Sequence, residues 1–420
     1  MRFATLAEWL AWQESLHPQA IDLGLARVAR VLERLDLPSQ PPFTISVGGT
    51  NGKGSCVAML DSILRAAGYR VGAYTSPHLL SYNERIRIDG QPVDDQTLMA
   101  AFDRVDRARQ DTTLSFFEFG TLAALVIFAA ARLDLRILEV GLGGRLDAVN
   151  IIDADLALIA SIDIDHQEWL GTTREAIGQE KAGIFRPGRP AVIADPDPPA
   201  SIGQVASARG APLYQPGRDF RHVRRDGAWD WEGQGQRWSG LPTPAIPGDH
   251  QFLNASAVLQ CLQLAAGARP VKEDAIRRGL AEVRLPGRFQ WFPGAIPVLL
   301  DVAHNPQAAR MLAGHLRQHY AHQRIHAVFA VMRDKDIAAM IEPLRDLVDR
   351  WFLAPLPMSR AAPPEEICEF LHNAGLSRID WGYADVRSTC QAARNAAAAG
   401  DLLLVFGSFF LVSDYLAQVA

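Results

Sequence analysis

The stretch VGGTNGKGSC, Val47 to Cys56, lies between an apolar run and a helical pattern, and it decides how the first half of the chain is interpreted. The strict P-loop pattern has a glycine five residues before its Gly-Lys pair and a serine or threonine directly after that pair. This stretch departs from the pattern twice. Val47 stands where the first glycine belongs, and Gly54 separates Lys53 from Ser55.

The physical requirements of a phosphate-binding loop are nevertheless met. Such a loop needs glycines that let consecutive N–H groups turn inward, a strand before it, a helix after it and a lysine that reaches the outer phosphates. The segment FTISVGG, residues 43–49, has the composition of a buried strand, and CVAMLDSILRAAG, residues 56–68, has apolar residues at helical spacing. The sequence therefore predicts a phosphate-binding loop, and the alternative is an ordinary glycine-rich turn.

Length and composition limit the class of protein. A chain of 420 residues exceeds what one hydrophobic core usually supports, so two domains are expected. The composition, 48% hydrophobic and 21% charged with a net charge of −5, is that of a soluble globular protein and disfavours a nucleic-acid partner. No apolar run reaches the roughly 18 residues of a membrane span. The four cysteines lack metal or disulfide spacing, so we expect a reducing cytoplasm.

Short apolar runs alternate with helical patterns along the chain, which predicts an α/β fold with a mainly parallel sheet. We expect a P-loop mononucleotide-binding domain at residues 1–285 and a smaller Rossmann-like α/β domain at residues 289–420. A hinge is expected at residues 285–288, because the Pro-Gly pair of LPGRF breaks the preceding helix. Residues 214–248 break the alternation and predict hairpins or an inserted loop region.

Polar residues follow several predicted strands, where ligands of open parallel sheets bind. Ser76 and Glu139 each end such a strand, and His166 follows another. A hydroxyl and a carboxylate beside a phosphate loop suit Mg²⁺, but a histidine ligand is unusual for that ion. From these residues alone His166 is equally well interpreted as a histidine that caps a strand end.

Asp301 and His304 follow a strand in the second half of the chain, within DVAHNP. Part of this segment is explained by helix-start chemistry, since Asn305 can cap the next helix and Pro306 suits its first turn. Asp301 and His304 are not explained in this way and are candidate site residues.

Eight segments, in order from Gly49 to Pro306, carry a resemblance to a known family: GTNGKGS, TSPHL, SFFEFGT, LEVGLGGRLDAVN, IDHQEWLG, EKAGIF, LPGRF and DVAHNP. Together they resemble the bacterial dihydrofolate synthase/folylpolyglutamate synthase family of the Mur ligase superfamily. IDLGLARV near the start and FGSFF near the end extend the resemblance to nearly the whole chain. The departures from the strict P-loop pattern are shared with this family.

The resemblance implies a role for individual residues. The implied ATP contacts are Asn51, Gly52, Lys53, Gly54, Ser55, Asn254, Arg288 and Asp301. The implied metal ligands are Ser76, Glu139 and His166. The implied pterin or folate contacts are Ile21, Asp22, Ser115, Phe116, Phe117, Glu118 and Arg145. Lys53, Lys181 and His304 are the implied catalytic residues, Lys181 as a carbamate, although its position alone suggests an ordinary helix lysine.

The implied activity is an ATP-dependent amide ligase that joins L-glutamate to dihydropteroate and to reduced folates through an acyl phosphate, with Mg²⁺ as cofactor. The implied protein is a cytoplasmic monomer without nucleic-acid or membrane partners. Three alternatives stay open at this point: folylpolyglutamate synthase activity alone, another Mur-type ligase, and a P-loop regulatory ATPase without ligase chemistry.

Overall fold

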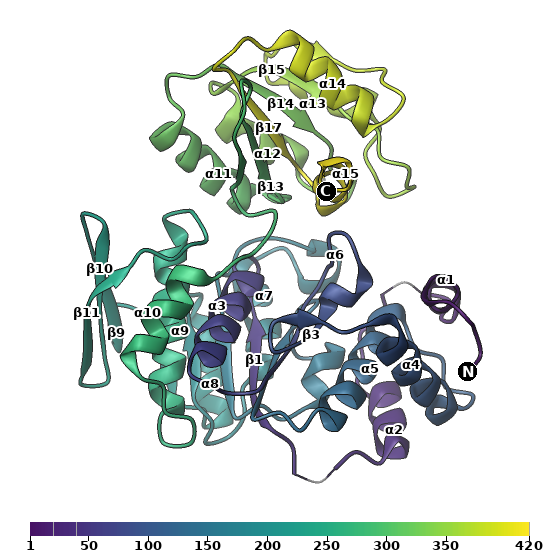
Figure 1. Cartoon of the computed structure of the whole chain (residues 1–420), viewed down its shortest axis with the longest axis vertical. Helices are drawn as coiled ribbons and strands as arrows, with labels where there is room; N and C mark the ends of the chain where they lie inside the picture. Colours follow the sequence, from purple (N-terminus) through teal and green to yellow (C-terminus); the bar gives the residue numbers. More distant parts are fainter. Residues whose placement is uncertain (20, 39, 420) are drawn as a thin grey trace. The chain divides into compact units, whose positions relative to one another are not determined.

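The computed structural model describes residues 1–19, 21–38 and 40–419, and its contacts group them into two compact units (Figure 1). Unit 1 comprises Met1–Asp163, Glu168–Ala245 and Phe252–Val283. Unit 2 comprises Ile164–Gln167, Ile246–Gln251 and the chain from Arg284 onward. The domain limits at residues 1–285 and 289–420, and the hinge at residues 285–288, stay predictions.

Unit 1 contains an eight-stranded sheet within its described residues, in the order β4-β3-β2-β5-β1-β6-β7-β8. The strands are β1 (Phe43–Gly48), β2 (Val71–Tyr74), β3 (Ile86–Ile88), β4 (Gln91–Pro92), β5 (Leu135–Glu139), β6 (Leu156–Ile159), β7 (Ala191–Ile193) and β8 (Leu213–Tyr214). All neighbours from β2 to β8 are parallel, and β3 and β4 are antiparallel. The predicted mainly parallel sheet is confirmed.

The register of the central strands brings their carboxyl ends together. Val47 on β1 pairs with Glu139 on β5 and with Leu158 on β6. The loop that follows β1 therefore begins beside the residues that follow β5 and β6, as expected for a ligand site in a parallel sheet.

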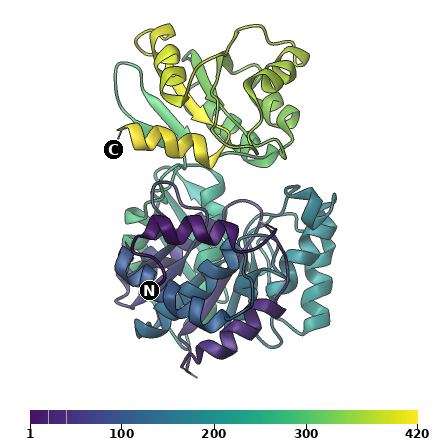
Figure 2. The ribbon, with the colours of Figure 1, turned by 90° about the vertical axis from the view of Figure 1, so that its right-hand side faces the viewer.

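The helices that lie wholly or mainly in unit 1 include α1 and α2, which precede β1, and others that follow strands of its sheets. Their bounds are α1 (Leu6–Ser15), α2 (Ala26–Leu35), α3 (Lys53–Ala66), α4 (Asp95–Arg109), α5 (Phe116–Ala130), α6 (Gln167–Leu170), α7 (Arg174–Lys181), α8 (Ala200–Arg209), α9 (His250–Ala265) and α10 (Glu273–Glu282). α10 packs on α3, where the Ser62 hydroxyl donates a hydrogen bond to the Gly279 carbonyl at 2.9 Å. α1 and α2, purple in Figure 2, lie against α4 and α5.

The segment that breaks the alternation forms a three-stranded antiparallel sheet, which confirms the predicted hairpins. Its strands are β9 (Phe220–Arg225), β10 (Ala228–Gly233) and β11 (Gln236–Pro242). Trp231 stacks on Trp238 with ring centroids 4.7 Å apart, and its indole N–H donates to the Ser256 carbonyl on α9. These contacts fix the small sheet on α9.

Unit 2 contains a six-stranded sheet within its described residues, in the order β12-β13-β17-β14-β15-β16. The strands are β12 (Gln290–Phe292), β13 (Val298–Asp301), β14 (Ile325–Phe329), β15 (Val348–Leu353), β16 (Ile379–Asp380) and β17 (Leu402–Phe406). The helices are α11 (Pro306–His319), α12 (Ile337–Ile341), α13 (Pro364–Asn373), α14 (Val386–Ala396) and α15 (Phe409–Val419). Only β12 is antiparallel to its neighbour among these described strands.

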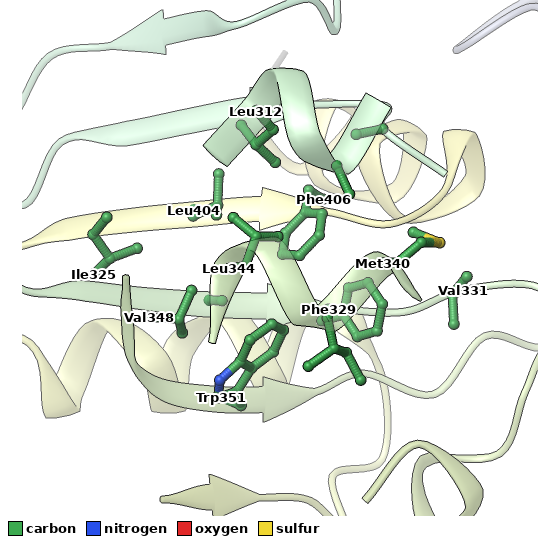
Figure 3. Close-up of a cluster of buried hydrophobic side chains, with 14 of the residues drawn as sticks. Leu312, Ile325, Phe329, Val331, Met340, Leu344, Val348, Trp351, Leu404 and Phe406 are labelled. Atoms are coloured by element: carbon green, nitrogen blue, oxygen red, sulfur yellow. The ribbon is translucent and has the colours of Figure 1, made fainter. Parts of the chain in front are cut away.

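The core of unit 2 lies between this sheet and the helices α11, α12 and α13. Phe329 lies at its centre, with ring centroids 4.8 Å from Phe406 and 5.7 Å from Trp351 (Figure 3). These three residues come from three neighbouring strands and belong to one core cluster. Leu404 belongs to the same cluster and lies two residues before Phe406 on β17, as the two-residue period of a strand requires. In the ranges that the structure describes, no helix is both long and apolar enough to cross a membrane.

Candidate functional site

The loop between β1 and α3 depends on two glycines with positive φ. Gly49 has φ 136°, and a Cβ there would lie 2.9 Å from the Ala160 Cβ. Gly52 has φ 87°, and a Cβ there would lie 2.9 Å from the Asn254 Oδ1. Both positions thus combine a backbone conformation that favours glycine with a close neighbour. Asn254, an implied ATP contact, lies on α9 beside this loop and is buried.

Two lysine side chains converge on the Gly49 carbonyl. The Lys53 Nζ donates to the Gly49 oxygen at 3.0 Å and to the Thr50 oxygen at 3.1 Å. The Lys181 Nζ donates to the same Gly49 oxygen at 2.9 Å. Lys181 ends α7 and is only 5% exposed, so it differs from the ordinary helix lysine that its sequence position suggests. The loop therefore carries two cationic groups at one point, beside the remaining implied residues Asn51, Gly54 and Ser55.

Ser76 and Glu139 lie together, as their positions at the ends of β2 and β5 predict. The Ser76 N–H donates to the Glu139 carboxylate at 3.3 Å, and Glu139 is buried. Burial, and then the charge of Glu139, raises the pKa of the neighbouring Cys56 thiol to about 12. Glu139 supplies a buried carboxylate and Ser76 carries a hydroxyl, which are oxygen donors of the kind that Mg²⁺ prefers, so these two residue types fit such an ion.

Asp147 is a buried carboxyl that the sequence analysis missed. It accepts hydrogen bonds from the Leu142 and Val149 N–H groups, at 2.8 and 2.9 Å, and so folds the loop after β5. Burial raises the pKa of Asp147 to about 6, although Lys53 acts in the opposite direction. Asp147 lies eight residues after Glu139, in the loop GLGGRLDAVN, and not at the end of a predicted strand. No sequence pattern therefore identifies it as a site residue.

A charged network joins the segments implied to contact the pterin. The Arg27 guanidinium donates to Asp22 at 2.6 Å and to Glu118 at 2.9 Å. His17 lies 3.0 Å from Asp22 and 2.9 Å from the Thr113 hydroxyl. Two implied residues from distant parts of the chain, Asp22 and Glu118, are thus brought together by Arg27, which the sequence analysis did not identify.

The N-terminus of α5 is fixed by a capping box between Ser115 and Glu118. Phe116 and Phe117 follow the cap, and Phe117 packs against Gly141, where a Cβ would lie 2.6 Å from its ring. Arg145 lies elsewhere in this unit, paired with Glu180 at 2.8 Å. Ile21, in the segment that carries Asp22, is partly exposed.

In unit 2, Asp301 is held at the end of β13 by backbone donors. The Phe289 N–H donates to one carboxylate oxygen at 3.0 Å and the Ala303 N–H to the other at 2.8 Å. Burial raises the pKa of Asp301, and although the charge of Arg288 acts in the opposite direction, the net pKa is about 6. The Arg288 guanidinium also lies 5.2 Å from the centre of the Phe409 ring. The two implied ATP residues of unit 2 are therefore neighbours.

Asp165 is the centre of a second polar cluster in unit 2. Its carboxylate lies 2.7 Å from the Lys335 Nζ and 3.0 Å from the Asn305 Nδ2. His304 donates from Nδ1 to the Val302 carbonyl at 2.9 Å, and its Nε2 lies 3.8 Å from Asp165. Burial opposes ionisation, but Lys335 and the two nearby histidines hold the pKa of Asp165 well below its ordinary value.

The neutral form of His304 is favoured, because burial and then Lys335 lower its pKa to about 4. Lys335 was not predicted, although its position after β14 in VMRDKD obeys the same strand-end rule that singled out Asp301. His166 has φ 51° and lies 4.0 Å from Asp165.

The predicted metal set divides between the units, since Ser76 and Glu139 belong to unit 1 and His166 to unit 2. Within residues 1–19, 21–38 and 40–419, no group of three or more His, Cys, Asp and Glu side chains is arranged for a metal ion. The three-residue set therefore stays a prediction, of which the structure brings two members together.

Comparisons with known proteins agree with this geometry. Residues 287–409 match the family model described as Mur ligase, glutamate ligase domain. With the phosphate-type loop of unit 1, this match defines the chain as an α/β ligase of the Mur type. The dihydrofolate synthase/folylpolyglutamate synthase of Escherichia coli (strain K12) is 44% identical over 408 residues, which cover 97% of this chain and 94% of that protein.

Solved structures are similar over almost the whole chain. The structure described as E. coli FolC in complex with DHPP and ADP has a TM-score of 0.94 and 42% identity, with 99% of this chain and 98% of that chain covered. A bifunctional folylpolyglutamate synthase/dihydrofolate synthase with Mn, AMPPNP and L-glutamate bound has a TM-score of 0.91 and 43% identity, with the same coverage. The chain belongs to the dihydrofolate synthase/folylpolyglutamate synthase family.

Proposed function

We propose that this protein uses ATP to join L-glutamate to dihydropteroate, giving dihydrofolate, and to folyl-glutamates, giving polyglutamates, with release of ADP and phosphate. The observation that carries the proposal is the convergence of Lys53 and Lys181 on the Gly49 carbonyl, in a chain of this family. Two cations at a glycine-built loop suit the transfer of a phosphoryl group, which is mainly a task of positioning and charge stabilisation.

The reaction has two balanced steps. A carboxylate oxygen of the pteroyl or folyl acceptor attacks the γ-phosphorus of ATP, the bond to the bridging oxygen breaks, and ADP leaves with that electron pair. The amine of L-glutamate then attacks the acyl phosphate carbon, phosphate leaves, and the amine loses a proton. Lys53 stabilises the charge on the transferring group. Burial and then Lys335 lower the pKa of His304 to about 4, so the ring is neutral near pH 7 and has a nitrogen lone pair that can accept the proton lost by the amine.

Mg²⁺ is our proposal for the metal, held by Ser76 and Glu139 with His166 as a third ligand. When bound it would supply Lewis-acid stabilisation of phosphate oxygens. The relative described with Mn, AMPPNP and L-glutamate supports a divalent ion in this family. Asn254, Arg288 and Asp301 would contact ATP, and the Asp22–Arg27–Glu118 network would bind or orient the pterin. The proposed monomeric state and cytoplasmic location rest on the resemblance, and sedimentation of the purified protein tests the former.

The test is product mass after incubation with MgATP, L-glutamate and, in separate tubes, dihydropteroate or tetrahydrofolate. We expect one added glutamyl residue in the first tube and at least one in the second. Addition only to tetrahydrofolate would restrict the activity to polyglutamylation. ATP hydrolysis that proceeds equally well without both other substrates would refute ligase function.

A further inference from the structure

Arg85 is a half-buried cation in unit 1 that neither the sequence analysis nor the proposed mechanism uses. It ends the 3₁₀ turn Tyr82–Arg85, which is followed by β3. Its Nε donates to the His78 Nδ1 at 2.8 Å. Its guanidinium carbon lies 5.3 Å from the centre of the Tyr82 ring and 5.5 Å from that of Phe116. The guanidinium is therefore held by one hydrogen bond to a histidine ring and lies within the range of cation–π attraction of two further rings.

The charge of Arg85 is not balanced by a carboxylate. Among the described residues, Arg85 forms no ion pair, and the only hydrogen bond of its side chain is the one to His78. The nearest acidic neighbour in sequence, Glu84, has its carboxylate oxygens engaged by the N–H groups of Leu79, Leu80 and Ser81. Burial and then Arg85 lower the pKa of His78 to about 4, so that ring is neutral. A half-buried arginine without an anion is uncommon unless a ligand supplies one.

Arg85 lies between two parts of the site. Its backbone carbonyl accepts the Thr75 N–H at 2.9 Å, and the next residue, Ser76, donates to Glu139 at 3.3 Å. On the other side, its guanidinium contacts Phe116, which lies in the segment implied to contact the pterin. All of these residues belong to unit 1. An anion bound by Arg85 would therefore lie beside the acceptor substrate and close to its reacting end.

We propose that Arg85 binds the α-carboxylate of the terminal glutamate of a folate and is the residue that allows polyglutamylation, which rests on the function proposed above. Dihydropteroate has one carboxylate, and that group reacts. The terminal glutamate of a folate has two, so one must be held while the other reacts. The two terminal nitrogens of an arginine match a carboxylate in a bidentate geometry. The incoming L-glutamate is a less suitable partner, because the matched glutamate ligase domain, residues 287–409, lies in unit 2.

The experiment compares Arg85→Gln and Arg85→Lys with wild type in separate assays with dihydropteroate and tetrahydrofolate, at saturating MgATP and L-glutamate. Arg85→Gln should raise KM for tetrahydrofolate about 10-fold to 100-fold, the range of a lost charged hydrogen bond, and leave KM for dihydropteroate nearly unchanged. Arg85→Lys keeps the positive charge but not the two parallel N–H donors of the guanidinium, so its KM for tetrahydrofolate should lie between those of the wild type and Arg85→Gln. Arg107→Gln is the matched control, since Arg107 is an exposed arginine of α4 that pairs with Asp103.

A tetrahydrofolate analogue with an amide in place of the α-carboxylate gives a second readout on folded enzyme. The KM of the wild type for this analogue should be as high as the KM of Arg85→Gln for tetrahydrofolate. The KM of Arg85→Gln for the analogue should be only slightly higher than that. Equal rises in KM for both acceptors, or a rise confined to L-glutamate, would overturn the assignment. Wild-type inactivity toward both acceptors would instead refute the proposed function. Thermal unfolding of each variant shows that the fold is kept.

Discussion

Replacing Gly49 by alanine should damage both the stability and the ATP kinetics of this protein. At φ 136° an alanine is strained, which costs about 1–3 kcal/mol. Its Cβ would also lie 2.9 Å from the Ala160 Cβ and 3.0 Å from the Ala160 nitrogen. That nitrogen donates to the Gly48 carbonyl at 2.9 Å, so the neighbour cannot move without losing a sheet hydrogen bond. Overpacking of this kind adds about 1–3 kcal/mol.

Gly68→Ala is the matched control, because Gly68 has φ 89° but a Cβ there meets nothing within 4 Å. The control carries the backbone strain without the collision. Gly49→Ala should therefore unfold at a temperature lower than Gly68→Ala by about 2–12 °C, from about 2–4 °C per kcal/mol in domains of 150–250 residues.

Gly49→Ala should also lower kcat/KM for ATP about 100-fold, since the Gly49 carbonyl positions both Lys53 and Lys181. The assays are thermal unfolding followed by circular dichroism and steady-state phosphate release. Equal melting temperatures and unchanged ATP kinetics in the two variants would refute the reasoning.

Three further changes test other parts of the site. Lys335→Met leaves the buried Asp165 carboxylate without its cation and should lower the free energy of unfolding in urea by about 3–5 kcal/mol. Adding Asp165→Asn to the same chain should restore part of this loss. Losses that simply add would show that the two residues do not stabilise each other. Because the pKa of Asp301 is raised to about 6, KM for ATP should rise as pH falls below 6, and a flat profile would exclude this carboxylate. Because the pKa of Asp301 is higher in the folded protein than the value of about 3.9 in the unfolded chain, protonated Asp301 stabilises the fold fully below about pH 3.9, and this contribution is lost as the pH rises through about 6. Arg27→Met removes the cation from Glu118, which among the described residues keeps only the hydrogen bond from the Ser115 N–H, and should raise KM for dihydropteroate about 10-fold or more. An unchanged KM would place the network outside the pterin site.

Strands with long apolar runs are the ones that a sequence can predict. β1, β5, β14 and β17 are buried along almost their whole length, so their composition is that of a buried strand. Strands such as β4, β12 and β16 cannot be predicted in this way, because each has only two or three residues, all half-buried or exposed. Such segments are too short to show a period of two, and only their pairing with a neighbour makes them strands.

The same limit applies to the site. Glu139 and Ser76 could be predicted, because each follows a recognisable strand in a parallel sheet whose carboxyl ends meet. Arg27 could not, since its meaning lies in a contact with Glu118, 91 residues away. Arg85 is even harder to predict from the sequence. Its distinguishing features are contacts with three rings and the absence of an ion pair among the described residues.

Lys181 shows how the structure gives a physical reason to expect carbamylation. Its ammonium and that of Lys53 donate to one carbonyl oxygen, so two like charges lie within twice a hydrogen-bond length of each other in a buried place. Such a pair is costly where water screens poorly. A carbamate nitrogen keeps one hydrogen, so it can still donate to the Gly49 oxygen, while its new carboxylate turns the repulsion with Lys53 into attraction. A carbamate at Lys181 would therefore keep the hydrogen bond to the Gly49 oxygen and would add two oxygens that could bind a metal ion or substrate.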